Sequence, residues 1–401
     1  MREGPTRLRR SLLPRRSVKR YIALARYKLT HGVVVAAVIG IVILAAVAIR
    51  QTLASRGIDF SFAYLSAPSR FNISEGLAPT WTGWAPTFES ANSASSNLAM
   101  LAAGLFNSIK VALLAIVFST MFGIGLGVSR LSTNWLVRNL AFSVGEFIRN
   151  TPLLIQLMFW YFAVMLQLPS ATSATNVDRW FVAEQSGVFL PLPHLSDSTG
   201  PASTALLAAA IILLAAACLQ RFPAWRRLTL VITGLGFVGA SYATGFSIDF
   251  DLPVLGRFGA TGGMRLTPEM SAILIAIMVN SAAYIAEIVR GAIEGLPKGQ
   301  WEAAAALGLS RGDTIKDVVL PQVFRVILPS LTNRYISLTK DTSIGIAVGF
   351  PDLFSVSGTV ANQTGRDFET VIVVMATYLL VSWIISAFTN VVNRRIALER
   401  A

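Results

Sequence analysis

The chain has 401 residues and a formal net charge of +13, but only 14% of its residues are charged and 54% are hydrophobic. An average soluble domain has about 25% charged residues, so the apolar surplus of this chain needs a membrane. Long uncharged runs recur along the sequence and leave no polar gap large enough for a sizeable soluble domain. The Lys and Arg residues fall beside these apolar runs, which argues against nucleic acid as the partner of the positive charge.

The N-terminal segment, 1–31, is strongly basic and lies directly before the first apolar run. This arrangement predicts a cytoplasmic orientation, with contact to anionic membrane lipid as a possible added role. The run Gly32–Ile49 has no charged residue and is predicted to be a first transmembrane span. A signal peptide is the competing interpretation, because Ala46-Val47-Ala48 resembles a cleavage site, but the run exceeds the usual apolar region of roughly 7 to 15 residues.

Seven further apolar runs are predicted as transmembrane helices, since each approaches the roughly 20 residues that a spanning helix needs. They cover about 103–128, 148–168, 202–219, 228–244, 268–289, 326–349 and 370–392. The segments assigned to the cytoplasm are all basic, whereas acidic residues roughly balance the Arg residues in 50–102, 169–201, 245–267 and 350–369. We therefore predict an all-α polytopic membrane protein with about eight transmembrane helices and both termini in the cytoplasm.

Two features of these spans concern packing. The runs 202–219 and 228–244 offer almost no polar side chain and are predicted to be peripheral. The motif Gly123-x-Gly125-x-Gly127 predicts close approach between helices, because it lacks the strand-to-helix context of a dinucleotide-binding site.

The sequence predicts no metal, disulfide or nucleotide chemistry on this chain. Its single cysteine, Cys218, excludes an intrachain disulfide and is interpreted as a packing residue. His31 and His194 are far apart, and no Cys/His cluster has the spacing of metal ligands. No Gly-x-x-x-x-Gly-Lys-Ser/Thr loop occurs, so the chain is not expected to bind ATP itself.

A polar loop between two predicted spans, Glu302–Pro321, contains the most informative motif. Its residues from Glu302 to Leu307 are mostly strong helix formers, and Gly308 suits a helix end. The spacing Glu-Ala-Ala, three residues, Gly, nine residues, Ile, one residue, Leu-Pro is that of the signature loop of ABC importer permeases. The matching residues are Glu302, Ala303, Ala304, Gly308, Val318, Leu320 and Pro321, with Val318 in place of Ile as the one departure. The resemblance implies that the loop 291–321 forms a coupling helix on a separate ATP-binding subunit, which holds ATP and Mg.

Two further stretches, Glu146–Gln156 and Tyr284–Gly291, resemble motifs of the polar amino-acid permeases. The extra first span and the central insertion resemble the extended, general L-amino-acid members of that family. The resemblance implies a type I importer core over 103–395, a periplasmic loop at 50–102 and inserted spans at about 202–244. It also implies a non-enzymatic permease of the bacterial inner membrane that carries L-amino acids into the cytoplasm. The implied partners are an ATPase dimer, a second permease subunit that is homologous but different, with a homodimer as the alternative, and a periplasmic amino-acid-binding protein.

Charged residues inside a predicted span are the candidates for the transport pathway, because they are rare in membranes and usually functional. Lys340, Asp341, Thr342 and Ser343 resemble a family segment that contributes to substrate handling, and a zwitterionic amino acid needs partners of both signs. The alternative is that Lys340 and Asp341 neutralise charges on neighbouring helices, such as Glu287 or Arg149.

Arg149, Glu287 and Arg290 lie near the inner ends of their spans and form a candidate inner gate. Glu287 and Arg290 are three residues apart and therefore share one helix face. A structural ion pair is an equally good interpretation. A different class of protein, a secondary transporter or channel that uses Lys340, Asp341 and Glu287, leaves the loop Glu302–Pro321 unexplained.

Overall fold

The computed structural model describes residues 60–398 except 82–85, 178–179, 197–198, 218–222 and 258, together with scattered residues between 32 and 55. The chain divides into two compact units, residues 1–64 and 65–401. In the first unit, the described residues from 32 to 55 are helical, as expected for the span predicted at Gly32–Ile49. The basic segment 1–31 and Cys218 lie outside the described residues.

The second unit is mostly helical, which confirms the predicted fold class. Among its described residues, α2 (Asn97–Ser129), α7 (Pro268–Glu294) and the apolar part of α12 (Asp367–Leu398) are long and apolar enough to cross a membrane on their own. A fourth candidate is a helix pair, Thr314–Val348 and Leu353–Thr364, which bends by 55° at a short break. The figure of about eight spans remains a prediction.

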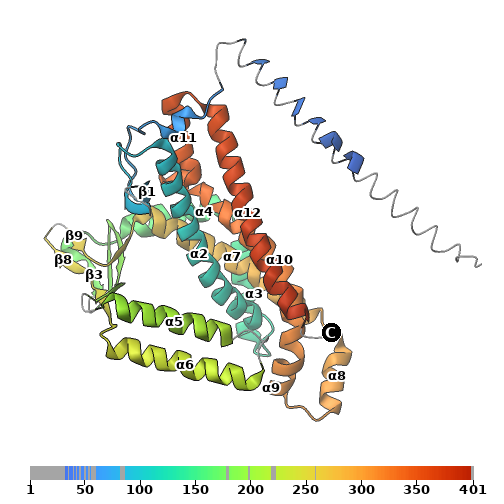
Figure 1. Cartoon of the computed structure of the whole chain (residues 1–401). Helices are drawn as coiled ribbons and strands as arrows, with labels where there is room; N and C mark the ends of the chain where they lie inside the picture. The colour runs from blue at the N-terminus through green and yellow to red at the C-terminus, as the bar shows by residue number, and fades with distance from the viewer. Residues whose placement is uncertain are drawn as a thin grey trace, which may run out of the picture. The chain divides into compact units, whose positions relative to one another are not determined.

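The most extensive helix contact is between α2 and α7 (Figure 1). Gly123 and Gly127 bring the two backbones together, because a Cβ on Gly123 would lie 2.7 Å from Ile285 Cβ and one on Gly127 would lie 2.8 Å from the Ala286 carbonyl oxygen. A Cβ on Gly125 would meet no atom within 4 Å. The predicted close helix approach is therefore confirmed for Gly123 and Gly127 but not for Gly125.

The run predicted as one span over 148–168 is interrupted. The helix α3 (Trp135–Asn150) ends before Pro152, and Thr151 is extended, as residues preceding proline commonly are. The chain resumes as α4 (Leu153–Met158), a π-helical segment η2 (Phe159–Val164) and a short 3-10 turn η3 (Met165–Gln167). Gln156 secures the break, because its Nε2 donates to the carbonyl oxygens of Ile148 and Thr151, each at 2.9 Å.

The central insertion forms a helical hairpin of α5 (Pro201–Ala217) and α6 (Ala224–Ala243), whose helices lie side by side in Figure 1. The buried Ser241 Oγ donates to the Ser203 carbonyl oxygen at 2.8 Å across the hairpin. Within the described part of the chain, α5 and α6 pack extensively against each other and not against other helices. This agrees with their predicted peripheral position.

Short antiparallel strands occupy polar segments for which no strand was predicted. The pairs are β1 (Leu77–Trp81) with β2 (Pro86–Ser90), β6 (Leu192–Leu195) with β7 (Ile248–Asp251), and β8 (Val254–Gly256) with β9 (Gly259–Thr261). A four-stranded sheet has the order β10-β5-β4-β3, from Met264–Leu266, Gly187–Leu190, Phe181–Glu184 and Thr175–Val177. Figure 1 shows strands gathered where α5 begins and α6 ends. Short 3-10 turns are η1 (Ala63–Ser66) and η4 (Ala171–Ser173).

The C-terminal half contains α8 (Lys298–Ala306), α9 (Arg311–Asp313), the π-helical segment η5 (Thr314–Val319), α10 (Leu320–Asp341), the 3-10 helix η6 (Thr342–Val348) and α11 (Leu353–Thr364) before α12. The span predicted at 326–349 therefore changes helix type after Asp341, and the segment 350–369 is largely a helix rather than a connecting loop. Gly349 has a left-handed φ of 80°, which ends η6, and Asp352 caps α11 by accepting from the Ser355 N–H at 2.9 Å.

Replacing Gly123 by Ala is expected to destabilise the protein by about 1–3 kcal/mol, because the added methyl group overpacks the contact between α2 and α7. The matched variant, Gly125→Ala, has room for the methyl group and is expected to be neutral or more stable by up to about 1 kcal/mol through helix propensity. Thermal unfolding of both purified variants in the same detergent measures the difference. Equal unfolding temperatures would contradict the packing described above.

Candidate functional site

The loop Glu302–Pro321 begins as the short helix α8, as the sequence predicts. The helix starts after Pro297 and is closed by Leu307, whose N–H donates to the Ala303 carbonyl oxygen. Gly308 follows with a left-handed φ of 71°, a conformation that L side chains rarely adopt. The glycine of the motif therefore has a backbone role: it turns the chain from α8 toward α9.

One side of α8 holds it against the spanning helices. Ala304 is buried, and Trp301 packs against a cluster that contains Val289 of α7 and Val323 of α10. The Gln322 side chain donates from Nε2 to Gln300 Oε1 at 3.0 Å. The helix is thus fixed to both α7 and α10, so a displacement of α8 acts on two candidate spans.

The other side of α8 is exposed and combines charged and polar side chains with alanines. Glu302 and Ala303 are exposed, and Leu307 has 79% of its surface accessible. Later motif residues belong to the following helices: Val318 lies in η5 and is half-buried, Leu320 is exposed and Pro321 is half-buried at the start of α10. The motif therefore combines buried anchors with an outward surface.

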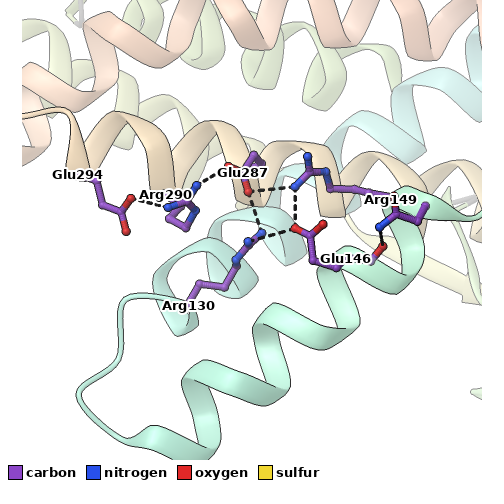
Figure 2. A network of polar contacts seen from close by, with 7 residues as sticks. Arg130, Glu146, Arg149, Glu287, Arg290 and Glu294 are labelled. Atoms are coloured by element: carbon purple, nitrogen blue, oxygen red, sulfur yellow. Dashed lines mark hydrogen bonds and ion pairs between the residues drawn. The ribbon is translucent and has the colours of Figure 1, made fainter.

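The three residues of the candidate inner gate come together near the C-terminal ends of α3 and α7 (Figure 2). Arg149 Nη1 donates to Glu287 Oε2 at 3.1 Å, and Arg290 Nη2 donates to Glu287 Oε1 at 2.5 Å. Glu287 is the centre of the cluster, because its two oxygens accept from different arginines. The predicted proximity of Arg149, Glu287 and Arg290 is therefore found in the structure.

Three further residues, Arg130, Glu146 and Glu294, complete this ionic network. The sequence did not predict their part in it. Arg130 follows the last turn of α2, and its side chain is only 3% exposed; its Nη1 lies 2.9 Å from Glu287 Oε2. Glu146 Oε1 lies 2.9 Å from Arg149 Nη1 and 3.4 Å from Arg130 Nη2, and Glu294 accepts from Arg290. Arg130 lies just after the span predicted at about 103–128, and nothing local in the sequence indicates its partner. The tertiary structure brings this end of α2 to Glu287 of α7.

The network borders a polar cavity of about 600 Å³. Its lining residues are Arg130, Arg138, Asn139, Phe142, Glu146, Arg149, Glu287, Arg290 and Glu294. The Arg130 guanidinium also lies over the Phe142 ring, 5.1 Å from its centroid.

The boundary between α10 and η6 contains Lys340, Asp341, Thr342 and Ser343. These four residues differ in burial and in their contacts. Thr342 is buried and donates to the Thr339 carbonyl oxygen at 2.9 Å, whereas Lys340 is exposed. Ser343 is half-buried and donates to the Lys340 carbonyl oxygen at 2.8 Å. Asp341 pairs with Arg334 at 3.4 Å, so the alternative in which Asp341 neutralises Arg149 is not what the structure shows.

Arg334 was missed, although a charged residue inside the predicted span 326–349 was itself the signal. It projects from α10 toward α7, where its Nη2 donates to Asn280 Oδ1 at 3.0 Å and to Ser281 Oγ at 2.7 Å. Its guanidinium lies 4.7 Å from the centroid of the Tyr284 ring.

Helices that are long and apolar enough to cross a membrane, with charged side chains that face one another, are typical of an integral membrane protein. Residues 252–398 match the family described as the binding-protein-dependent transport system inner membrane component. The chain is 36% identical over 357 residues to the protein YhdX of Escherichia coli (strain K12). The aligned region covers 86% of this chain and 87% of YhdX. It is also 36% identical over 347 residues to the general L-amino acid transport system permease protein AapQ of Rhizobium johnstonii, which covers 84% of each chain.

The chain belongs to the family of amino-acid ABC transporter permeases. Among solved structures, the crystal structure of an amino acid ABC transporter with histidines is 22% identical to it, with a TM-score of 0.46. That match covers 74% of this chain and 94% of the other.

Replacing Glu287 by Gln is expected to destabilise the protein by about 1–3 kcal/mol or more, because buried Arg130 then lacks its nearest acidic partner. The matched variant is Glu294→Gln. The Glu294 side chain is 52% exposed, and its ion pair with Arg290 contributes about 0.3–0.5 kcal/mol. Thermal unfolding in detergent compares the two. If Glu294→Gln is the more destabilising change, Glu287 is not the centre of the network.

Proposed function

We propose that this chain is the permease subunit of an ATP-driven importer that carries L-amino acids from the periplasm to the cytoplasm. The named activities of its relatives support the substrate class: AapQ belongs to a general L-amino acid system. BztB of Rhodobacter capsulatus, 31% identical over 392 residues, belongs to a glutamate/glutamine/aspartate/asparagine system. The proposed location is the bacterial inner membrane, with both termini in the cytoplasm, as the basic segments favour.

The observation that carries this proposal is the exposed side of α8, together with the exposed Leu307 that follows the helix in the Glu302–Pro321 loop. A surface-exposed Leu307 beside Glu302 and Ala303 is suited to insertion into a cleft of another protein. We propose a dimer of ATP-binding subunits as that protein, which would hold the ATP and Mg. A second permease subunit, homologous but different from this chain, and a periplasmic amino-acid-binding protein would complete the complex.

The proposed mechanism is alternating access. ATP binding closes the ATPase pair and moves α8, and the cavity between two permease subunits then opens outward to receive an amino acid. The short turn Gly295–Pro297 joins α8 to α7, and η5 joins the loop to α10. Movement of α8 would therefore act on Glu287 through α7 and on the pathway residues Lys340–Ser343 through α10.

Replacing Glu302 by Ala is expected to lower recovery of the ATPase with the permease about tenfold, which corresponds to roughly 1.4 kcal/mol of lost docking energy. Alanine preserves the helix, and Glu302 is exposed, so thermal stability should not change. Lys298→Ala, on the same helix outside the motif, is the control. Co-purification from membranes and ATP-dependent uptake in proteoliposomes measure the effect; normal assembly with full transport would rule out the proposed docking role.

The inner-gate role predicts a leak. Glu287→Gln should release amino acid from preloaded proteoliposomes without ATP, because the α3–α7 contact then lacks its central acid. The assay is run at a temperature at which the variant remains folded, with Glu294→Gln as the control. Unchanged leak and unchanged transport would leave Glu287 with a structural role only.

A further inference from the structure

We propose that Arg138, near the start of α3, binds the phosphate group of an anionic membrane phospholipid, and that the polar cavity beside the ionic network receives the lipid headgroup. The binding residue belongs to α3 and not to the basic segment 1–31. The site is also separate from the residues proposed for the amino-acid pathway, so it adds a lipid contact to the proposed import function.

Arg138 is the cation of this cavity that the ionic network leaves unbalanced. The cavity is lined by four arginines and three glutamates, a formal excess of one positive charge. Arg130, Arg149 and Arg290 each pair with a glutamate. Arg138 has no acidic partner within the described part of the chain, and its Nη1 donates to the Ser132 carbonyl oxygen at 3.2 Å. An exposed guanidinium with one backbone contact keeps further N–H donors for a phosphate.

The position of Arg138 along the chain favours a lipid over a phosphate in solution. Helix α2, a candidate span, ends at Ser129, and α3 begins at Trp135 after a short turn. Arg138 is therefore close in sequence to the point at which a candidate span ends. Trp135 is 66% exposed, and tryptophan is enriched where membrane and water meet.

Exposed aromatic side chains flank Arg138 on one side of α3. Trp135 precedes it by three residues and Phe142 follows it by four, and these spacings place side chains on the same helix face. Phe142 lines the cavity and is 52% exposed. A cation between two exposed rings suits an amphiphile, whose phosphate pairs with the guanidinium while its apolar part covers the rings. A soluble phosphate would leave both rings in water.

The lipid would bind the same helix face that makes the inner-gate contact. Arg149 is eleven residues beyond Arg138, which is close to three full turns, and lines the same cavity. Its Nη1 donates to Glu287 Oε2 of α7 at 3.1 Å. A phosphate bound near the start of α3 would therefore help to hold the helix that presents Arg149 to α7.

The test uses the full-length chain, purified with its co-expressed partner subunits, in nanodiscs of equimolar phosphatidylglycerol and phosphatidylcholine. Trp135 is replaced by the photoreactive residue benzoylphenylalanine, which keeps an aromatic side chain, and mass spectrometry identifies the molecules crosslinked there. Arg138→Gln is the test variant, and Arg138→Lys keeps the charge. Lys298→Gln removes an exposed cation of α8 outside the cavity and is the matched control.

With Arg138 present, phosphatidylglycerol is expected to be crosslinked about fivefold more often than phosphatidylcholine. Arg138→Gln should bring this ratio close to one, whereas Lys298→Gln should leave it unchanged. Arg138→Lys should keep part of the preference, because it retains the charge but not the planar fork. Soluble glycerol phosphate in the buffer should not alter the ratio. Because Arg138 is exposed, thermal unfolding of Arg138→Gln should match that of the parent protein.

Three results would overturn the lipid site. The first is an equal yield of the two lipids in the parent protein, or an unchanged ratio in Arg138→Gln. The second is displacement of phosphatidylglycerol by glycerol phosphate, which would indicate a site for a soluble anion. The third is crosslinking to a partner subunit without any crosslinked lipid, which would indicate a protein interface at this face of α3.

Discussion

The close approach of α2 and α7 at Gly123 and Gly127 is the constraint on which the candidate site depends. A side chain at either glycine would meet Ile285 or the Ala286 carbonyl, so only glycine allows this separation. Arg130 follows Gly127 by less than one turn, and Glu287 follows Ala286 directly. Backbone contact at the glycines therefore brings a buried guanidinium to a carboxylate on the neighbouring helix, at 2.9 Å.

A charge that is taken out of water needs a partner, and this requirement organises the contact between the C-terminal ends of α2, α3 and α7. Arg130, Arg149 and Arg290 share Glu287, so three helical segments meet at one carboxylate (Figure 2). The same helix, α7, leads within three residues into α8, whose outer surface is exposed. The helix α8 and the ionic network are therefore connected through α7.

The bend between η6 and α11 has a comparable tertiary cause. Asn107 Nδ2 donates to the Pro351 carbonyl oxygen at 3.0 Å, and the Leu353 N–H donates to Ser108 Oγ at 3.1 Å. Two polar residues of α2 thus satisfy backbone groups that the break would otherwise leave unpaired inside an apolar environment. The residues Lys340–Ser343 lie one short 3-10 helix before this break, at the boundary between α10 and η6.

The sequence by itself determined the membrane-spanning class, the family and the position of α8, because hydrophobic runs, basic loops and motif spacing are local properties of the chain. It also indicated that Arg149, Glu287 and Arg290 belong together. Only the tertiary structure decided that Arg130 joins them, that Arg334 rather than a residue of another helix pairs with Asp341, and that strands form from 169–201 and 245–267. These outcomes depend on which surfaces meet across long separations along the chain, and a hydrophobic pattern specifies burial without specifying the neighbour.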